Sequence, residues 1–161
     1  MAMGTVARAR KPSARSTAAA LPLAGRTALI TGSVQGIGLA TAHALSALGA
    51  TVMLTDIDRP ADLNGVVRQL RTKHGTNAAF ESADLNSEAE IGALVRSTLD
   101  AFGSLDILVN NAAVRTRESI ETIAVEDWRR ALAVNLTAPF HLIRGALPSM
   151  RERGWGRIVN I

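Results

Sequence analysis

The amino-acid sequence predicts an α/β fold, a parallel sheet covered by helices on both faces. Three observations support this prediction. From Gly25 onward, short apolar runs typical of buried strands alternate with stretches of helical periodicity. The first of these runs leads directly into a glycine-rich turn, and the second ends in the carboxylate of Asp56. The chain of 161 residues has the length of one domain and is 47% apolar, enough to bury a core.

The expected elements alternate regularly along the chain. Strands are expected at residues 27–30, 51–55, 78–82, 105–109 and 156–161. Helices are expected at residues 36–48, 61–74, 87–102 and 125–153. The apolar stripe of the first helix consists of Ile37, Ala40, Ala44, Leu45 and Leu48, with Gly49 as C-cap. Ser87 and Glu90 have the spacing of a capping box at the start of the third helix.

The glycine-rich turn follows the first strand and has the spacing Gly-x-x-x-Gly-x-Gly. If a pyrophosphate binds here, Gly32 allows the tight turn, Gly36 lets the backbone approach the phosphates and Gly38 lets the helix pack closely on the sheet. Free N–H groups at the helix N-terminus would then face the anion. The residues expected to contact such a cofactor are Thr31, Gly32, Ser33, Gln35, Gly36, Ile37 and Gly38. The alternative is a tight turn without a ligand.

Asp56 lies at the end of the second strand, eighteen residues after Gly38. A carboxylate at this point can accept hydrogen bonds from ribose hydroxyls and would repel a 2′-phosphate, which favours NAD over NADP. Gln35 supplies no cation to offset that repulsion, although Arg59 follows nearby. The alternative is a solvated acid in a loop.

Composition excludes several classes of site and of protein. The chain has no cysteine, so disulfides, thiolate zinc sites and cysteine nucleophiles are excluded. The three histidines, His43, His74 and His141, have no metal-ligand spacing, and no metal is expected. No apolar run is long enough to span a bilayer. Trp128 and Trp155 are interpreted as packing anchors. Solvated faces are expected to carry Arg129, Arg130, Arg144, Arg151, Arg153 and Arg157.

The net positive charge comes from the N-terminal end of the chain. The first twenty residues contain Arg8, Arg10, Lys11 and Arg15 and no acid, whereas the other 14 basic residues balance the 14 acidic ones. Residues 1–24 are therefore interpreted as a disordered basic tail, with a mitochondrial presequence as the lesser alternative. The neutral body gives no reason to expect a nucleic-acid partner, and a cytoplasmic location is expected.

Several motifs occur together in one order. Thr31-Gly32-x-x-x-Gly36-Ile37-Gly38 is followed by Asp84-Leu85, Asn110-Asn111-Ala112 and Asn135. In this order and spacing, residues 25–161 resemble the short-chain dehydrogenase/reductase family. The resemblance implies a Rossmann-like doubly wound parallel sheet, here truncated after the fifth strand. It also implies a nicotinamide dinucleotide, hydride transfer to or from a carbonyl or alcohol carbon of a small molecule, and a homodimeric or homotetrameric parent enzyme.

The resemblance assigns roles to further residues. Asp84 matches the position that faces the adenine amino group, and the backbone of Leu85 contributes there. Asn110 and Asn111 match a pair that steadies the fourth strand and flanks the cofactor, together with Ala112. Ala113 stands where the family usually has glycine.

Asn135 matches the helix asparagine that holds a water in the family's proton relay, and it is the only catalytic position expected within the chain. The alternatives that the residues themselves leave open are a capped turn for the asparagine pair and a local hydrogen bond for Asn135.

Within the family, residues 141–161 are similar to 3-hydroxybutyrate dehydrogenases. In those enzymes a polar residue beyond the double asparagine helps to hold the substrate carboxylate, and Arg115 occupies that position here. A guanidinium could bind a carboxylate bidentately, or it could be a surface charge. The substrate assignment to 3-hydroxybutyrate rests on this similarity.

The residues that transfer the proton in this family are a tyrosine, a lysine and a serine. The chain has no tyrosine, its only lysines are Lys11 and Lys73, and the serine would be expected just beyond Ile161. We therefore expect an N-terminal fragment of a dehydrogenase that does not turn over substrate. The alternative is a noncatalytic dinucleotide-binding or partner-binding module.

Overall fold

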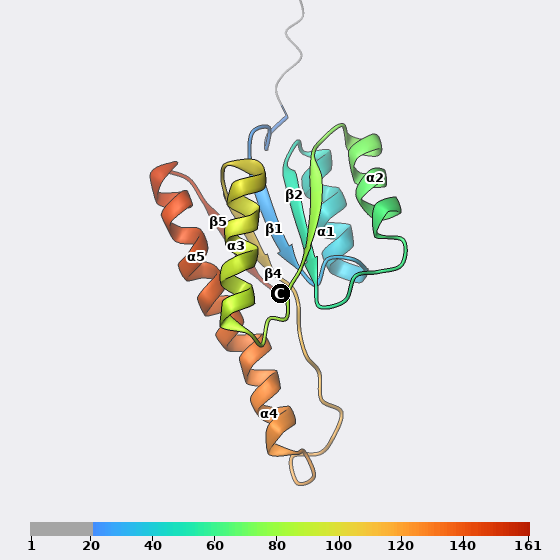
Figure 1. Cartoon of the computed structure of the whole chain (residues 1–161), viewed down its shortest axis with the longest axis vertical. Helices are drawn as coiled ribbons and strands as arrows, with labels where there is room; N and C mark the ends of the chain where they lie inside the picture. The colour runs from blue at the N-terminus through green and yellow to red at the C-terminus, as the bar shows by residue number, and fades with distance from the viewer. Residues whose placement is uncertain (1–20) are drawn as a thin grey trace, which may run out of the picture.

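The structure is a computed structural model that describes residues 21–161. Its strands are β1 (Thr27–Thr31), β2 (Thr51–Asp56), β3 (Ala78–Ser82), β4 (Ile107–Asn110) and β5 (Arg157–Asn160). They form one sheet in the order β3-β2-β1-β4-β5, with every neighbouring pair parallel (Figure 1). The predicted Rossmann-like α/β fold is confirmed.

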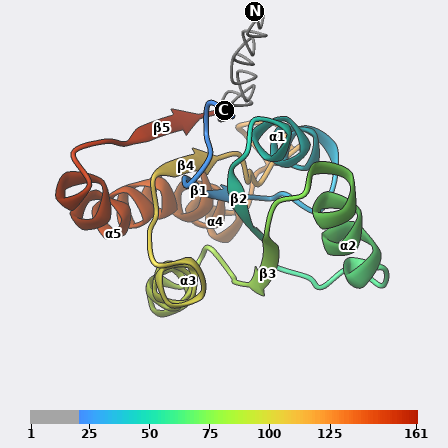
Figure 2. The same ribbon diagram turned by 90° about the horizontal axis from the view of Figure 1, so that it is seen from above.

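The helices divide between the two faces of this sheet. They are α1 (Gly36–Ala47), α2 (Leu63–His74), α3 (Glu88–Phe102), α4 (Val125–Leu132), the π-helical segment η1 (Ala133–Thr137) and α5 (Ala138–Glu152). Figure 2 shows α1 and α2 on one side of the sheet and α3 and α5 on the other. The chain is therefore doubly wound around the central strand β1.

Alternating strand residues fill two separate cores, because successive side chains in a strand point to opposite faces. Ala28 and Ile30 of β1 belong to the core that includes Leu70 of α2. Leu29, between them, belongs to the core that includes Leu94 of α3 and Leu142 of α5. The strands are apolar throughout, as expected of a parallel sheet covered on both sides.

Helix α1 buries a different face from the one its apolar residues predicted. Its buried residues are Gly38, Ala42 and Ser46, whereas Ile37 and Leu48 are 64% and 43% exposed. Small residues face the sheet because the helix lies too close to it for larger side chains. Of the predicted apolar stripe, Leu45 packs against the core, and the other four residues are exposed.

Helix α3 has only half of the predicted capping box. The Ser87 hydroxyl accepts the Glu90 N–H at 3.3 Å, but the Glu90 carboxylate does not return to the Ser87 N–H. It accepts the N–H of Asp84 at 2.8 Å instead. The carboxylate therefore holds the segment after β3 in place.

The long helix expected at 125–153 is interrupted by η1. Pro139 has no N–H to donate to the carbonyl of Asn135 four residues earlier, and its ring crowds that carbonyl. At this point the Ala138 N–H reaches the Ala133 carbonyl five residues back. The proline therefore explains why a π-helical turn separates α4 from α5.

The N-terminal boundary of the fold lies before Gly25. Residues 21–25 form a turn, the Leu23 N–H donates to the Leu48 carbonyl at 2.9 Å, and Leu23 packs against the core beneath α1. The tail predicted at residues 1–24 thus overlaps ordered structure at its end, while residues 1–20 lie outside the described part. None of the helices in residues 21–161 is long and apolar enough to cross a membrane.

A buried carboxylate lies at the opposite end of the sheet from the glycine turn. Asp106 is fully buried, and its oxygens accept hydrogen bonds from the Thr27 N–H, Arg153, Arg26 and Ser104. Arg26 also lies over the ring of Trp155 at 4.2 Å, which confirms Trp155 as a packing anchor. Trp128 is 50% exposed and is not one.

Arg153 is exposed, as predicted for a solvated face, and it also makes a contact that the sequence did not predict. Its Nε lies 2.7 Å from the Asp106 carboxylate. The arginine is therefore a counter-ion of a buried acid that follows α3.

We predict that Asp106→Asn lowers the free energy of unfolding by about 3 kcal/mol at neutral pH. Burial by itself raises the pKa of Asp106, but the four hydrogen bonds outweigh it and leave this pKa below the ordinary value. A lowered folded-state pKa stabilises the fold above about pH 4, and this contribution is lost as the pH falls through that pKa. Urea unfolding followed by circular dichroism measures the difference.

The matched control is Asp100→Asn, because Asp100 is exposed on α3. This variant should unfold like the unaltered protein. The difference in free energy of unfolding between Asp106→Asn and the unaltered protein should decrease below about pH 4. A difference that stays constant with pH would contradict the lowered pKa of Asp106.

Candidate functional site

The candidate site lies at the point where the strand order of the sheet reverses. The chain passes from β1 outward through β2 to β3, then returns to the other side of β1 with β4 and β5. Helix α1, which follows β1, and α3, which leads into β4, cover opposite faces of the sheet. In sheets of this kind, ligands bind outside the carboxyl ends of the strands at such a point. Gly32 and Ala112 follow β1 and β4 at this position.

The three glycines of the turn differ in their surroundings. Gly32 and Gly36 have φ angles of +59° and +54°, which favour glycine, and a Cβ on Gly32 would lie 3.0 Å from the Ala112 Cα. A Cβ on Gly38 would collide with the Gly32 carbonyl and lie 2.7 Å from the Asn111 amide nitrogen. Around Gly36 no atom lies within 4 Å of that position. The turn is therefore tightly packed at Gly32 and Gly38 and open at Gly36.

Asn111 fixes the turn from the neighbouring strand. Its side-chain amide donates to the carbonyls of both Thr31 and Gly32 at 2.9 Å. In return, the Thr31 hydroxyl accepts the N–H groups of Asn111 and Ala112 at 3.0 Å. Because Thr31 is buried and engaged in this way, its side chain faces the fold and braces the turn.

Ser33 is likewise turned inward. Its hydroxyl donates to the Ile30 carbonyl at 2.7 Å and accepts the Thr55 N–H at 3.0 Å, and its own N–H donates to the Thr55 carbonyl. Ser33 was predicted to contact the cofactor, but its hydroxyl and its N–H both form hydrogen bonds that connect β1 and β2. Gln35, Gly36 and Ile37 are exposed.

The N-terminus of α1 is left without side-chain ligands. Its N-cap, Gln35, makes no side-chain cap hydrogen bond, and the first turn contains no acid. By contrast, α2 is capped by Asp62, and α3 is capped by Ser87 with acids in its first turn. The free N–H groups and the positive end of the α1 dipole therefore remain available to an anion.

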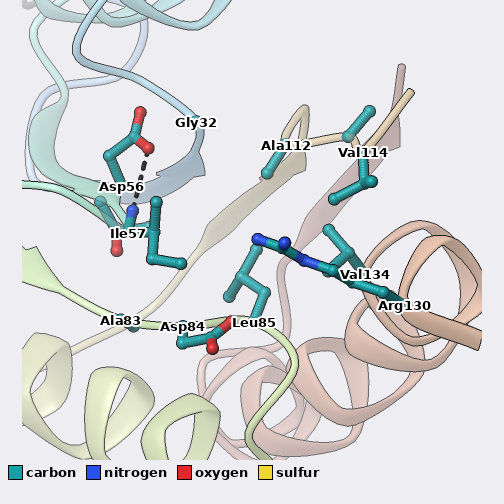
Figure 3. Close-up of a pocket in the computed structure, with 12 residues that line it drawn as sticks. Gly32, Asp56, Ile57, Ala83, Asp84, Leu85, Ala112, Val114, Arg130 and Val134 are labelled. Carbon is teal, nitrogen blue, oxygen red and sulfur yellow. Dashed lines mark hydrogen bonds between the residues drawn. The ribbon is translucent and has the colours of Figure 1, made fainter. Parts of the chain in front are cut away.

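A pocket opens beside this turn, over the ends of four strands (Figure 3). Its walls come from the end of β2, from the segments that follow β1, β2, β3 and β4, and from α4 with η1. The lining residues are Gly32, Thr55, Asp56, Ile57, Ala83, Asp84, Leu85, Ala112, Ala113, Val114, Arg130 and Val134. The structure thus brings together the predicted residues Gly32, Asp56, Asp84, Leu85, Ala112 and Ala113.

Two carboxylates line the pocket, and each has one oxygen engaged by a local backbone N–H. Asp56 accepts the Ile57 N–H at 2.9 Å, and Asp84 accepts the Asn86 N–H at 2.9 Å. Within residues 21–161 neither carboxylate has a cationic partner. Both can therefore accept hydrogen bonds from a ligand.

Asn135 secures the wall of the pocket from η1. Its side-chain oxygen accepts the Val114 N–H at 2.8 Å, and its amide donates to the Val114 carbonyl at 2.9 Å. The oxygen and the nitrogen of the side chain are thus both engaged in holding the segment after β4. Because Pro139 has no N–H, the backbone carbonyl of Asn135 lacks the hydrogen-bond donor that a regular α-helix would supply.

Arg115 and Arg130 are both exposed, in agreement with the surface-charge alternative for Arg115 and the solvated face expected for Arg130. Arg115 does not line the pocket, whereas Arg130 does, which the sequence analysis did not predict. His43 and His74, far apart in sequence, lie 3.1 Å apart between ring nitrogens. The described residues contain no group of three or more potential metal ligands.

Helical periodicity was the signal from which Arg130 could have been identified as a pocket residue. It precedes Val134 by one helical turn and so shares its side of the helix.

We predict that Gly38→Ala destabilises the fold by about 1–3 kcal/mol, because the added methyl group collides with backbone rather than with a flexible side chain. Thermal unfolding measures the effect. The matched control is Gly92→Ala within α3, where a Cβ meets only the end of the Arg96 side chain. That change should leave stability equal or raise it, since alanine favours helix. Equal stability of the two variants would contradict the close packing of α1.

We predict that Asn135→Ala frees the Val114 amide, because both hydrogen bonds of the clamp are lost. Hydrogen exchange at Val114 should then accelerate by at least about tenfold, equivalent to about 1.4 kcal/mol of lost protection. Exchange in β1 should stay slow. If exchange at Val114 is unchanged, the clamp does not hold this segment.

Comparison with known proteins agrees with this geometry. The family model for short chain dehydrogenases matches residues 26–161. Over 136 residues the chain is 43% identical to the D-beta-hydroxybutyrate dehydrogenase of Rhizobium meliloti, covering 84% of this chain and 53% of that protein. Over 139 residues it is 40% identical to the protein of the same name from Cupriavidus necator, covering 86% and 53%.

A solved metagenomic short-chain oxidoreductase in complex with NADP is also similar in structure. It superposes with a TM-score of 0.79 at 37% identity, covering 86% of this chain and 62% of that one. The chain spans about half the length of the curated relatives it matches. From the family match and the shared fold, the chain belongs to the short-chain dehydrogenase family.

Proposed function

We propose that this chain is the dinucleotide-binding part of an NAD-dependent dehydrogenase. The observation that carries the proposal is the uncapped N-terminus of α1, which follows an open glycine turn and lies beside a pocket with two carboxylates that have no cationic partner within residues 21–161. When bound, the nicotinamide would accept or donate the hydride that interconverts a small hydroxy and keto substrate.

The cofactor's parts would be held by separate elements. The N–H groups of Gly36, Ile37 and Gly38 would bind the pyrophosphate at the end of α1. Asp56 would accept hydrogen bonds from the adenosine ribose, and Asp84 from the base. The segment after β4, held by Asn111 and Asn135, would support the rest of the molecule.

The preference for NAD over NADP is proposed from the charge near the ribose. Asp56 would repel a 2′-phosphate, and Arg59, the nearby cation in the sequence, does not line the pocket. The metagenomic relative, in contrast, was solved with NADP. Titrating the chain with each cofactor in turn therefore measures the preference directly.

The substrate proposal, 3-hydroxybutyrate, is supported by two relatives named D-beta-hydroxybutyrate dehydrogenase. Arg115 would bind the substrate carboxylate as a surface-accessible guanidinium. Assembly into a homodimer or homotetramer and a cytoplasmic location remain predictions, as does the absence of a nucleic-acid partner.

Proton transfer needs a group that these 161 residues lack, because they contain no tyrosine. We expect the isolated chain to bind NAD without reducing it.

Asn135 would act as a positioning residue, holding Val114 with its side chain and offering its freed carbonyl to a water. A noncatalytic dinucleotide-binding module is the second candidate, favoured by the same missing tyrosine.

The turnover assay follows NADH formation from 3-hydroxybutyrate. No turnover by the chain is expected. Turnover would contradict the proposed need for tyrosine.

We predict that Asp56→Ala weakens NAD binding about tenfold and reduces the preference for NAD over NADP, because the carboxylate no longer binds the ribose or repels a 2′-phosphate. Isothermal titration calorimetry with both cofactors measures this. The control is Asp58→Ala, an exposed acid two residues away that does not line the pocket. If the two variants bind NAD equally well, or the unaltered chain binds neither cofactor, the proposed function is wrong.

A further inference from the structure

Arg130 is the cation in the wall of the pocket. It lies on α4, a helix with no buried residue, and is exposed overall. Figure 3 shows its side chain extending from α4 across the pocket toward Leu85. A long side chain held over an opening in this way can contact whatever occupies it.

The guanidinium of Arg130 has no ion-pair partner within residues 21–161. Its neighbour Arg129, in contrast, pairs with Glu126 at 3.4 Å. Although two carboxylates line the same pocket, neither forms a salt bridge with Arg130. No acid within residues 21–161 therefore holds this guanidinium by an ion pair.

The surroundings of Arg130 suit a flat aromatic ring. Apolar side chains of Ile57, Leu85 and Val134 form walls on both sides of the opening (Figure 3). The carboxylate of Asp84 can accept hydrogen bonds from an amino group at its edge. An apolar slot with such an acceptor is typical of a site for an amino-substituted base.

The order of the strands determines which part of a dinucleotide would reach this slot. If α1 binds the pyrophosphate and Asp56 at the end of β2 binds the ribose, the base attached to that ribose lies beside β2 and β3. Ile57, Asp84 and Leu85 follow these two strands. The slot is therefore placed for the adenine.

We propose that Arg130 is a binding residue for the adenine ring, stacking its guanidinium plane on the face of the base. The inference rests on the proposed function, since it assumes a dinucleotide in this pocket. Guanidinium groups bind π-faces by electrostatic attraction and dispersion, and more strongly than a flexible ammonium does where stacking is possible. Arg130 would thereby link the otherwise exposed α4 to the bound cofactor.

The test compares Arg130→Ala and Arg130→Lys with Arg129→Ala as the matched control. The ligands are NAD, adenosine, which has the base without phosphates, and nicotinamide mononucleotide, which has a phosphate without adenine. Calorimetry measures NAD binding, and ligand-observed NMR measures the two weaker ligands. Circular dichroism checks that each variant is folded.

Arg130→Ala should weaken NAD and adenosine by a similar factor, about fivefold, and leave nicotinamide mononucleotide unchanged. Arg130→Lys should recover only part of the loss, and Arg129→Ala should bind all three like the unaltered chain.

Three results would overturn the proposal while NAD binding by the unaltered chain upholds the proposed function. In the first, Arg130→Ala binds NAD as well as Arg129→Ala does. In the second, the loss appears with NAD but not with adenosine, which would assign Arg130 to the phosphates. In the third, Arg130→Lys restores full affinity, which would show that charge without the planar face is sufficient. Failure of the unaltered chain to bind NAD would instead overturn the proposed function.

Discussion

The close approach of helix α1 to the end of β1 is the constraint on which the rest of the site depends. Gly38 has no room for a Cβ above the Gly32 carbonyl, so this part of α1 lies against the turn itself. The Asn111 amide then ties the carbonyls of Thr31 and Gly32 to the neighbouring strand. An anion site built from backbone N–H groups needs such fixed geometry, because it has no side chain that could adjust.

The pocket extends from this centre to the segments that follow β2, β3 and β4. The acids follow β2 and β3, and a hydrogen bond from the Asp84 N–H to Glu90 fixes the second of these segments. On the other side, Asn135 holds Val114 through two hydrogen bonds. The π-helical turn that presents Asn135 arises from Pro139. A single proline thus shapes the wall opposite the acids.

The sequence alone was sufficient for the fold class, because apolar strands and helical stretches alternate in a regular order. The residues themselves pointed to two pocket positions, Gly32 and Asp56, since glycines and acids that directly follow parallel strands converge at one edge of the sheet. Four more, Asp84, Leu85, Ala112 and Ala113, were assigned from the resemblance to the family. It was less informative where packing decides: the fully buried residues of α1 are small, and of its predicted apolar stripe only Leu45 packs against the core. The inward side chain of Ser33 likewise depends on tertiary contacts that local patterns do not encode, whereas the helical spacing between Arg130 and Val134 was a local signal for the position of Arg130.

The most direct test of the account is an NMR titration of the 161-residue chain with NAD. Amide signals of residues 32–38, 56–57, 83–85 and 112–114 should shift together, because these segments surround one proposed binding site. Signals from β5, at the sheet edge, should remain in place. Shifts confined to other surfaces, or no shifts from a folded chain, would contradict the claim that the glycine turn and the two acids form a dinucleotide site.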